Sequence, residues 1–410
     1  MAGGNIPERL KISTFKLNSL LAITQAINEN LPQNELLQRY EQILKVDLNI
    51  GKILVYKYDS SSWSCLLSSG IKEEVPVQIN VETDLLKYTE ITFISSNSEP
   101  SAESFDIVIP VYNNNKPLAY VLIGDIEEEG EGVSPIIKHL HFIQTLSNII
   151  IVAIENIRLF QESLRQMAIK KEMELASRMQ SMLIPNNKEL PHNEKIWISA
   201  FYHPHFEVGG DYYDFIKLSS NEVGFCIADV SGKGISAALL MSNFQANLRA
   251  LFTTEISLTT LVVKLNDCVM KSANGEKFIT LFVGKYNLET KELEYVNAGH
   301  NQPILYEMVS RNLLFLKDGC VGMGMLEDIP VVKKGTLQIK ETTKLLCYTD
   351  GLVELMDEKE VEMGTTILES HISNELNIQE SIDSIIADQH ILSGNKAIFD
   401  DITMLGIEFY

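Results

Sequence analysis

The stretch GFCIADVSGKGISAALL, residues 224–240, passes from one hydrophobic pattern to another across a glycine-rich turn. Its first part, Gly224–Asp229, is a short apolar run of the kind that forms a buried strand, whereas Ser236–Phe252 has the spacing of an amphipathic helix. Asp229 ends the run, and the turn 231–234 follows. The stretch therefore predicts a strand, a turn and a helix, with a carboxylate at the edge of a sheet.

Further strand-like runs surround this unit between Pro185 and the C-terminus: Ile196–Tyr202, Phe278–Asn287, Leu293–Ala298, Leu345–Tyr348 and Ile402–Phe409. A second helical pattern covers Leu258–Ser272. Strands with short connections and two or three helices between them are typical of an α+β domain. We expect one such domain over residues 185–410, which is long enough to bury a core of its own.

Three more aspartate clusters border strands in this region: Gly209-Gly210-Asp211, Thr349-Asp350-Gly351 and Asp400-Asp401-Ile402-Thr403. Carboxylates that converge without histidine or thiolate partners favour Mg²⁺ or Mn²⁺ over Zn²⁺. Two such ions, about 3.5–4 Å apart, bind a phosphoryl oxygen and activate a water for in-line attack. Taken singly, each cluster is more often a turn, and the sequence from Asp229 to Gly234 also fits a helix cap or a phosphate cradle.

The N-terminal third has its own alternation of patterns. Helical spacing at 17–27 and 36–44 precedes four alternating runs: Lys52–Tyr58, Trp63–Ser68, Ile107–Tyr112 and Ala119–Gly124. The turn-forming residues 113–117 join the last two runs into a predicted hairpin. We expect a tail over residues 1–12 and a second α+β domain over residues 13–160.

A long helix is predicted to connect the two domains over residues 146–184, overlapping the end of the first and stopping at Pro185. Its apolar residues step by four and three, as in a coiled-coil seam: Leu146, Ile150, Ala153, Ile157, Phe160, Leu164 and Met167. The register breaks at Lys171 and resumes out of phase. We expect the helix to pair with its twin in a homodimer; the alternative is that its apolar stripe packs on its own domain.

The 410 residues carry a net charge of −21, which argues against non-specific nucleic-acid binding. Residues 1–160 contribute −8, residues 185–410 contribute −14, and the segment between them is +1. No run approaches the roughly 20 apolar residues that span a bilayer, and the five cysteines form no CxxC pair. We expect a cytoplasmic protein with small buried thiols and no membrane partner.

Several ordered motifs resemble those of the SpoIIE/RsbU-type serine phosphatases, the bacterial branch of the PPM metal-dependent protein phosphatases. They are ELASRMQSMLIP (174–185), VGGDYYDF (208–215), DVSGKGISAALL (229–240), NAGHNQP (297–303), TDGLVE (349–354) and DDIT (400–403). The resemblance covers residues 172–410. The N-terminal third resembles a GAF sensor domain, on its element order and the hairpin at 107–125.

The resemblance implies an α/β/β/α sandwich, in which two antiparallel sheets are flanked by helices, and a site with two Mn²⁺ or Mg²⁺ ions. It implies that Asp211 is a ligand of one metal, that Asp229 bridges both with the Val230 carbonyl nearby, and that Asp350 and Asp400 bind the other. These four aspartates form the predicted catalytic set. Asp401 is a further implied metal ligand, at a position where the family varies between Asp and Asn.

The implied substrate is a phosphoserine or phosphothreonine on a small protein, by analogy an anti-sigma-factor antagonist of the STAS type. The resemblance also implies direct hydrolysis without a covalent phosphoenzyme. An unidentified ligand or protein would act on the GAF-like domain and change the register of the connecting helix.

Two residues near these motifs are left outside the predicted catalytic set. His300 is more often a hydrogen-bonding turn residue than a general acid, and Lys233 is either a solvated lysine or a group that steers phosphate. Three other functions fit the sequence less well. A diguanylate cyclase needs Glu-Phe where Tyr212-Tyr213 stands, a histidine kinase needs a glycine-rich nucleotide lid, and a non-catalytic phosphatase-fold module predicts the loss of metal aspartates.

Overall fold

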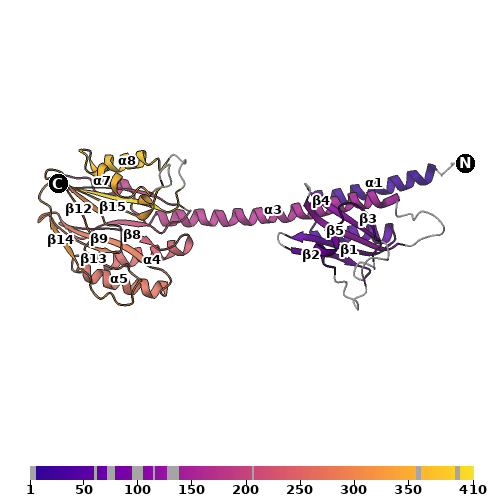
Figure 1. Cartoon of the computed structure of the whole chain (residues 1–410), viewed down its shortest axis with the longest axis horizontal. Helices are drawn as coiled ribbons and strands as arrows, with labels where there is room; N and C mark the ends of the chain where they lie inside the picture. The colour runs from indigo at the N-terminus through magenta and orange to yellow at the C-terminus, as the bar shows by residue number, and fades with distance from the viewer. Residues whose placement is uncertain are drawn as a thin grey trace. The chain divides into compact units, whose positions relative to one another are not determined.

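The computed structural model describes residues 6–59, 62–71, 79–94, 105–113, 116–126, 138–205, 207–356, 362–392 and 398–410 (Figure 1). The chain divides into two compact units, the first ending at Met167 and the second beginning at Ala168. This boundary falls inside the helix α3, Leu140–Ser181, so one continuous helix belongs to both units.

The N-terminal unit is built on a five-stranded antiparallel sheet in the order β2-β1-β5-β4-β3. Its strands are β1 (Ile50–Asp59), β2 (Ser62–Ser69), β3 (Thr92–Phe93), β4 (Ile107–Asn113) and β5 (Lys116–Ile126). Asn113 pairs with Lys116, which confirms the predicted hairpin. Helices α1 (Ile6–Asn28), α2 (Gln33–Gln42) and the first half of α3 share a core with one face of the sheet. A smaller cluster on the other face includes residues of the π-helical turn η2 (Val81–Leu85).

Two expectations for this unit were wrong. Residues 6–12, assigned to a tail, form the first turns of α1; a proline at position 7 is tolerated there because its missing N–H has no partner in the first turn anyway. Cys65 is exposed, since β2 is an edge strand, whereas Cys226 and Cys347 are buried as expected.

The apolar seam of α3 changes its surroundings along the helix. Leu146 and Ile150 are fully buried in the N-terminal core, so the first half of the seam packs on its own domain. Phe160, Leu164 and Met167 are 64%, 49% and 64% exposed, and no described residue covers them. By length and composition alone α3 could cross a membrane, but half of the residues in its most apolar stretch are buried within the protein.

The C-terminal unit contains two packed sheets. The first has the order β13-β10-β9-β8-β7, with β14 also on β10; the second has the order β12-β11-β15-β16-β6. The strands of the first are β7 (Tyr212–Lys217), β8 (Glu222–Val230), β9 (Ile279–Asn287), β10 (Glu292–Ala298), β13 (Gly319–Cys320) and β14 (Gly335–Gln338). Those of the second are β6 (Ile196–His203), β11 (Ile304–Glu307), β12 (Asn312–Phe315), β15 (Thr343–Tyr348) and β16 (Ile402–Phe409). All pairings are antiparallel except that of β10 with β13.

Helices cover both outer faces of this sandwich (Figure 1). Helices α4 (Ile235–Leu251) and α5 (Leu258–Ala273) pack on the first sheet, and α7 (Thr366–Ile372) and α8 (Ile378–Asp388) pack on the second. Between the sheets the rings of Tyr286 and Phe409 lie 4.5 Å apart. The α+β class, the N-terminal sheet domain, the long helix and the α/β/β/α sandwich are therefore confirmed.

Candidate metal centre

Strand register brings the four aspartate clusters to one end of the sandwich. Tyr212 pairs with Ala228, so Asp211 and Asp229 are neighbours across β7 and β8. In the second sheet Tyr348 pairs with Met404, which places Asp350 just beyond one strand end and Asp400 just before the next strand. The site is thus assembled from segments that lie almost 200 residues apart in the chain.

Asp211 is held at the junction of the two sheets. Its carboxylate is 1% exposed, and Oδ2 accepts a hydrogen bond from Thr349 Oγ1 at 2.8 Å and another from Thr403 Oγ1. Both threonines belong to motifs of the resemblance, TDG and DDIT, but neither was a predicted site residue. Thr349 directly precedes Asp350, and Thr403 follows Asp401 by two residues. This proximity to predicted ligands was the sequence signal that could have identified the two threonines as residues that orient a ligand.

Negative charge in this cluster is poorly compensated. Burial, and then the charges of Asp229 and Asp401, raise the pKa of Asp211 well above its usual range. Burial, and then Asp350 and Asp400, raise the pKa of Asp229 to about 7, although a hydrogen bond with Asp211 opposes the shift. Burial and Asp400 also raise the pKa of Asp350. The carboxylates therefore repel one another unless a cation or protons intervene.

The donor set fits a hard divalent cation. Carboxylate and carbonyl oxygens are the ligands that Mg²⁺ and Mn²⁺ prefer. Gly210 is needed beside them, because a Cβ there would lie 2.9 Å from the carbonyl oxygen of Val230, the predicted backbone ligand. Within the described residues, no three acidic, histidine or cysteine side chains alone form a group that encloses an ion. The carbonyl of Val230, at one of the ions, and water would have to complete the coordination.

Asp401 has a second task besides its predicted role as a ligand. Its Oδ2 accepts hydrogen bonds from the backbone N–H of Gly210 at 2.6 Å and of Asp211 at 3.4 Å, and its Oδ1 accepts from His205 N at 2.8 Å. A Cβ at Gly209 would lie 2.2 Å from Oδ2. Asp401 therefore fixes the backbone that carries Asp211, and this explains the paired glycines.

Lys233 forms an ion pair with one of the aspartates, whereas His300 is a buried residue that is hydrogen-bonded to a threonine. Lys233 Nζ lies 3.0 Å from Asp400 Oδ2 and also donates to the Phe399 carbonyl, so it is an ion-pair partner of a predicted ligand. His300 is buried, with Nδ1 2.9 Å from Thr280 Oγ1, and burial lowers its pKa to about 4. A neutral, hydrogen-bonded imidazole supports the structural interpretation of His300.

The end of α3 is attached to the same loop. Gln180 Nε2 donates to the Gly209 carbonyl at 2.6 Å, and Gly209 N donates back to Gln180 Oε1 at 3.1 Å. The Gln180 side chain is buried. Tyr213, on the other side of Asp211, donates its hydroxyl to the Pro185 carbonyl at 2.6 Å. A helix end thus brackets the segment that carries the innermost aspartate.

Comparison with known proteins identifies this unit. Residues 219–410 match the family model of Stage II sporulation protein E (SpoIIE). The chain carries a SpoIIE-type phosphatase domain. The resemblance predicted from the motifs is therefore confirmed, together with the enzyme class it implies for this domain, a serine/threonine phosphatase of the PPM type.

Relatives support the same assignment. The chain is 28% identical to the phosphoserine phosphatase RsbU of Bacillus subtilis over 243 residues, 58% of this chain and 70% of that protein. It is 26% identical to RsbP of the same organism over 189 residues, 45% of this chain and 46% of that protein. The SiaA-PP2C domain of Pseudomonas aeruginosa shares the fold, with a TM-score of 0.50 at 18% identity over 60% of this chain and 99% of that one.

Proposed function

We propose that this SpoIIE-type domain hydrolyses phosphoserine or phosphothreonine on a small regulatory protein with the help of two Mg²⁺ or Mn²⁺ ions. The observation that carries the proposal is the group of mutually repelling aspartates at one end of the sandwich. In a phosphatase domain, divalent cations can neutralise the negative charge of such a cluster and also bind the phosphoryl group.

Asp211, Asp229 and the Val230 carbonyl would hold one ion, with Asp229 shared by a second that Asp350 and Asp400 also bind. When bound, two such ions supply a water of lowered pKa and neutralise charge on the phosphoryl oxygens. Thr349 and Thr403 hold the Asp211 carboxylate in one orientation.

The two cysteines on β8 and β15, the strands that lead to Asp229 and Asp350, are poor candidates for covalent catalysis. Cys226 and Cys347 are fully buried, and burial raises the pKa of both thiols. A buried protonated thiol is a poor nucleophile, so attack by a water-derived oxygen remains the route that the side chains support.

Release of p-nitrophenol from p-nitrophenyl phosphate in the presence of Mn²⁺ tests the activity. The wild type should hydrolyse the ester and Asp229→Asn should not, while Asp267→Asn, at an exposed acid on α5, should match the wild type. Equal and negligible rates in all three proteins would instead favour the non-catalytic binding module.

For the substrate we propose a phosphorylated anti-sigma-factor antagonist of the STAS type, an analogy with RsbU-like proteins. An Asp350→Asn variant, weakened in metal binding but intact in fold, serves as a trap for phosphoproteins. The captured protein should lose phosphate on incubation with wild type and Mn²⁺. Capture of proteins that the wild type leaves phosphorylated would contradict the assignment.

We further propose that the N-terminal unit is a GAF-like sensor that acts through α3. The supporting observations are that α3 belongs to both units and that Gln180, near its end, holds Gly209. Insertion of four residues beside Lys171 should change the hydrolysis rate, because it rotates the register of the seam, whereas a seven-residue insertion restores it. Identical rates in both variants would contradict control by helix register.

The exposed second half of the α3 seam supports a homodimer. Phe160, Leu164 and Met167 continue the heptad spacing beyond the N-terminal core and are exposed. Leu164→Glu should convert the dimer to monomer in sedimentation equilibrium, whereas Arg165→Glu, an exposed neighbour off the seam, should not. A wild-type monomer at all concentrations would exclude the dimer.

We also propose that the protein is cytoplasmic and has no membrane partner. Its net charge of −21 supports the further proposal that it does not bind nucleic acid. Fractionation of cells that express the tagged full chain tests the location. Recovery in the membrane fraction would overturn it.

A further inference from the structure

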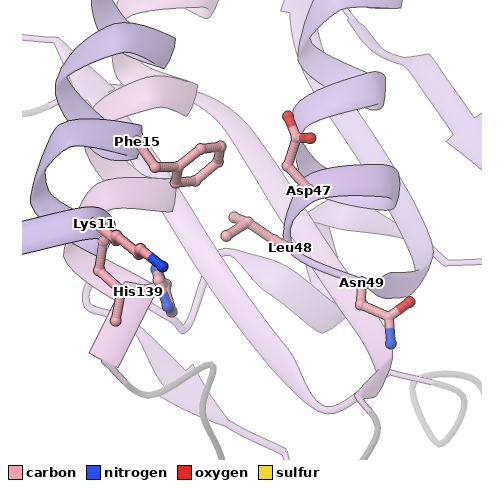
Figure 2. Close-up of a pocket in the computed structure, with 7 residues that line it drawn as sticks. Lys11, Phe15, Asp47, Leu48, Asn49 and His139 are labelled. Carbon is pink, nitrogen blue, oxygen red and sulfur yellow. The ribbon is translucent and has the colours of Figure 1, made fainter. Parts of the chain in front are cut away.

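The N-terminal unit contains a pocket that has no part in the metal centre. Its volume is about 420 Å³, within the range of small-molecule sites. Among its lining residues, Lys11, Ile12 and Phe15 come from α1, and Asp47 is the last residue of the turn η1 (Ile43–Asp47). Leu48 and Asn49 lie between η1 and β1, and His139 directly precedes α3 (Figure 2).

The lining is divided by chemistry. Figure 2 shows Lys11 and His139 on one side of the pocket, Asp47 and Asn49 on the other, and Phe15 and Leu48 between them. Within the described part of the chain, Lys11 forms no ion pair, and His139 Nδ1 is buried without a hydrogen-bond partner. The first side therefore offers a cation and an unsatisfied ring nitrogen to a ligand.

Two more cations reinforce this side. Lys16 Nζ donates to the Lys138 carbonyl at 2.9 Å, and both lysines add to burial in lowering the pKa of His139. Such a local excess of positive charge is unusual in a domain whose residues 1–160 sum to −8. It favours an anionic group at Lys11 and His139, while Asp47 disfavours a second negative charge at the far side.

We propose that this pocket binds a small monocarboxylate with an apolar body. The carboxylate accepts hydrogen bonds from Lys11 Nζ and from His139, and the body packs on Phe15 and Leu48. Because His139 directly precedes α3, the occupant contacts the residue immediately before the connecting helix. The consequence for phosphatase rate rests on the proposed function, but the binding itself does not.

Isothermal titration calorimetry on the full chain tests the binding directly, with phenylacetate as the probe and phenylacetamide as its neutral counterpart. Phenylacetate should bind at least about tenfold more tightly than the amide, since charge-assisted hydrogen bonds are lost in the amide. Lys11→Met should weaken phenylacetate binding about tenfold. The matched control, Lys116→Met, lies at an exposed site in the β4–β5 hairpin and should bind as the wild type does.

Two more arms make the assignment specific to the pocket. Phenylsuccinate, a dianion, should bind more weakly than phenylacetate to the wild type, and Asp47→Asn should narrow that difference. Leu48→Trp, which fills the pocket, should abolish binding while circular dichroism shows an intact fold. The proposal would be overturned if the wild type bound no phenylacetate up to about 10 mM. It would also be overturned if the Lys11→Met and Leu48→Trp variants each bound phenylacetate as tightly as the wild type.

Calorimetry also separates this inference from the proposed activity. A chain that binds phenylacetate in the pocket but hydrolyses no phosphoester would retain the site and lose the phosphatase assignment. If the chain hydrolysed p-nitrophenyl phosphate but bound no carboxylate, the phosphatase assignment would stand and the proposed pocket ligand would be wrong. If both hold, saturating phenylacetate should change the hydrolysis rate of the wild type and leave that of Leu48→Trp unchanged.

Discussion

The two units of this chain bury charged side chains in opposite electrostatic settings. In the N-terminal unit Lys57, 2% exposed, lies 2.5 Å from an oxygen of Asp59 and 2.7 Å from one of Glu155, and Arg158 binds the same Glu155. Hydrogen bonds from Arg158 and then from Lys57 lower the pKa of Glu155 to about 2. In the C-terminal unit, burial and neighbouring acids raise the pKa of Asp211, Asp229 and Asp350 instead.

The difference separates a structural cluster from a functional one. Glu155 has a folded-state pKa below its unfolded value, so its ionisation stabilises the fold above about pH 4.5 and this contribution is lost as the pH falls toward 2. Asp229 has the opposite shift, so its ionisation costs stability near neutral pH. Lys57 and Arg158 balance the charge of the first cluster, whereas the carboxylates of the second repel one another unless protons or a cation intervene.

The largest expected effect comes from removing one charge of the unbalanced cluster. Asp229→Asn should lower the rate of phosphoester hydrolysis with Mn²⁺ by at least about a thousandfold, because Asp229 is the proposed shared ligand of both ions. In EDTA the same variant should unfold at a higher temperature than the wild type, since one repelling carboxylate is gone. Lower stability in EDTA would contradict the view that the cluster is strained by repulsion.

Breaking the balanced cluster should have the opposite outcome. Glu155→Gln leaves the buried Lys57 with Asp59 alone and should destabilise the N-terminal unit by about 3 kcal/mol at pH 7. Lowering the pH from 4.5 to 2 should lower the free energy of unfolding of the N-terminal unit more in the wild type than in Glu155→Gln. Urea unfolding monitored by Trp63 measures this in a Trp197→Phe background, because the chain has only these two tryptophans.

Two controls accompany the Glu155→Gln experiment: a variant at an exposed acid of the same helix, and the rate of phosphoester hydrolysis. Glu162→Gln changes an exposed acid of α3 and should leave the stability unchanged. The rate of p-nitrophenyl phosphate hydrolysis should be the same in both variants, at temperatures where the N-terminal unit remains folded. A destabilisation by Glu162→Gln as large as that by Glu155→Gln would show that the Lys57 ion pairs are not its cause.

Divalent ions should stabilise one unit and not the other. At about a hundred times its dissociation constant, Mn²⁺ should add about 2.7 kcal/mol to the unfolding free energy of the C-terminal unit. Trp197, in β6, reports this in a Trp63→Phe background. Trp63 fluorescence in the converse background should show no shift, and a shift there of equal size would mean that the ion acts elsewhere.

Sequence patterns predicted the periodic parts of both units and the strand-end acids, because burial of one face imposes period two or 3.6 on the chain. They missed β7, since its polar start at Tyr212-Tyr213-Asp214 hides the alternation. The charge of the buried Asp214 is balanced by an ion pair with Arg249 from α4 at 2.7 Å, and its carboxylate also accepts a hydrogen bond from the Tyr212 hydroxyl. They also missed the tasks of Thr349 and Gln180. Both depend on contacts across tens of residues or more, which no local spacing records.

Gln180 lies on the part of α3 that belongs to the C-terminal unit, so it tests how that helix supports the cluster of mutually repelling aspartates. Its two hydrogen bonds to Gly209 are buried, and Gly209 lies two residues before Asp211. Gln180→Ala leaves both backbone groups of Gly209 without partners, which should displace the loop and lower the phosphatase rate about tenfold.

The loss caused by Gln180→Ala should lie partly in metal affinity, because the affected residue orients a predicted ligand and does not touch the phosphoester. A higher Mn²⁺ concentration should therefore restore part of the rate in the variant, whereas it restores nothing in Asp229→Asn. Gln166→Ala, at an exposed position of the same helix, provides the control. A rate deficit in Gln180→Ala that is independent of Mn²⁺ would instead mean that Gln180 acts on the fold of the loop and not on the geometry of the ligand.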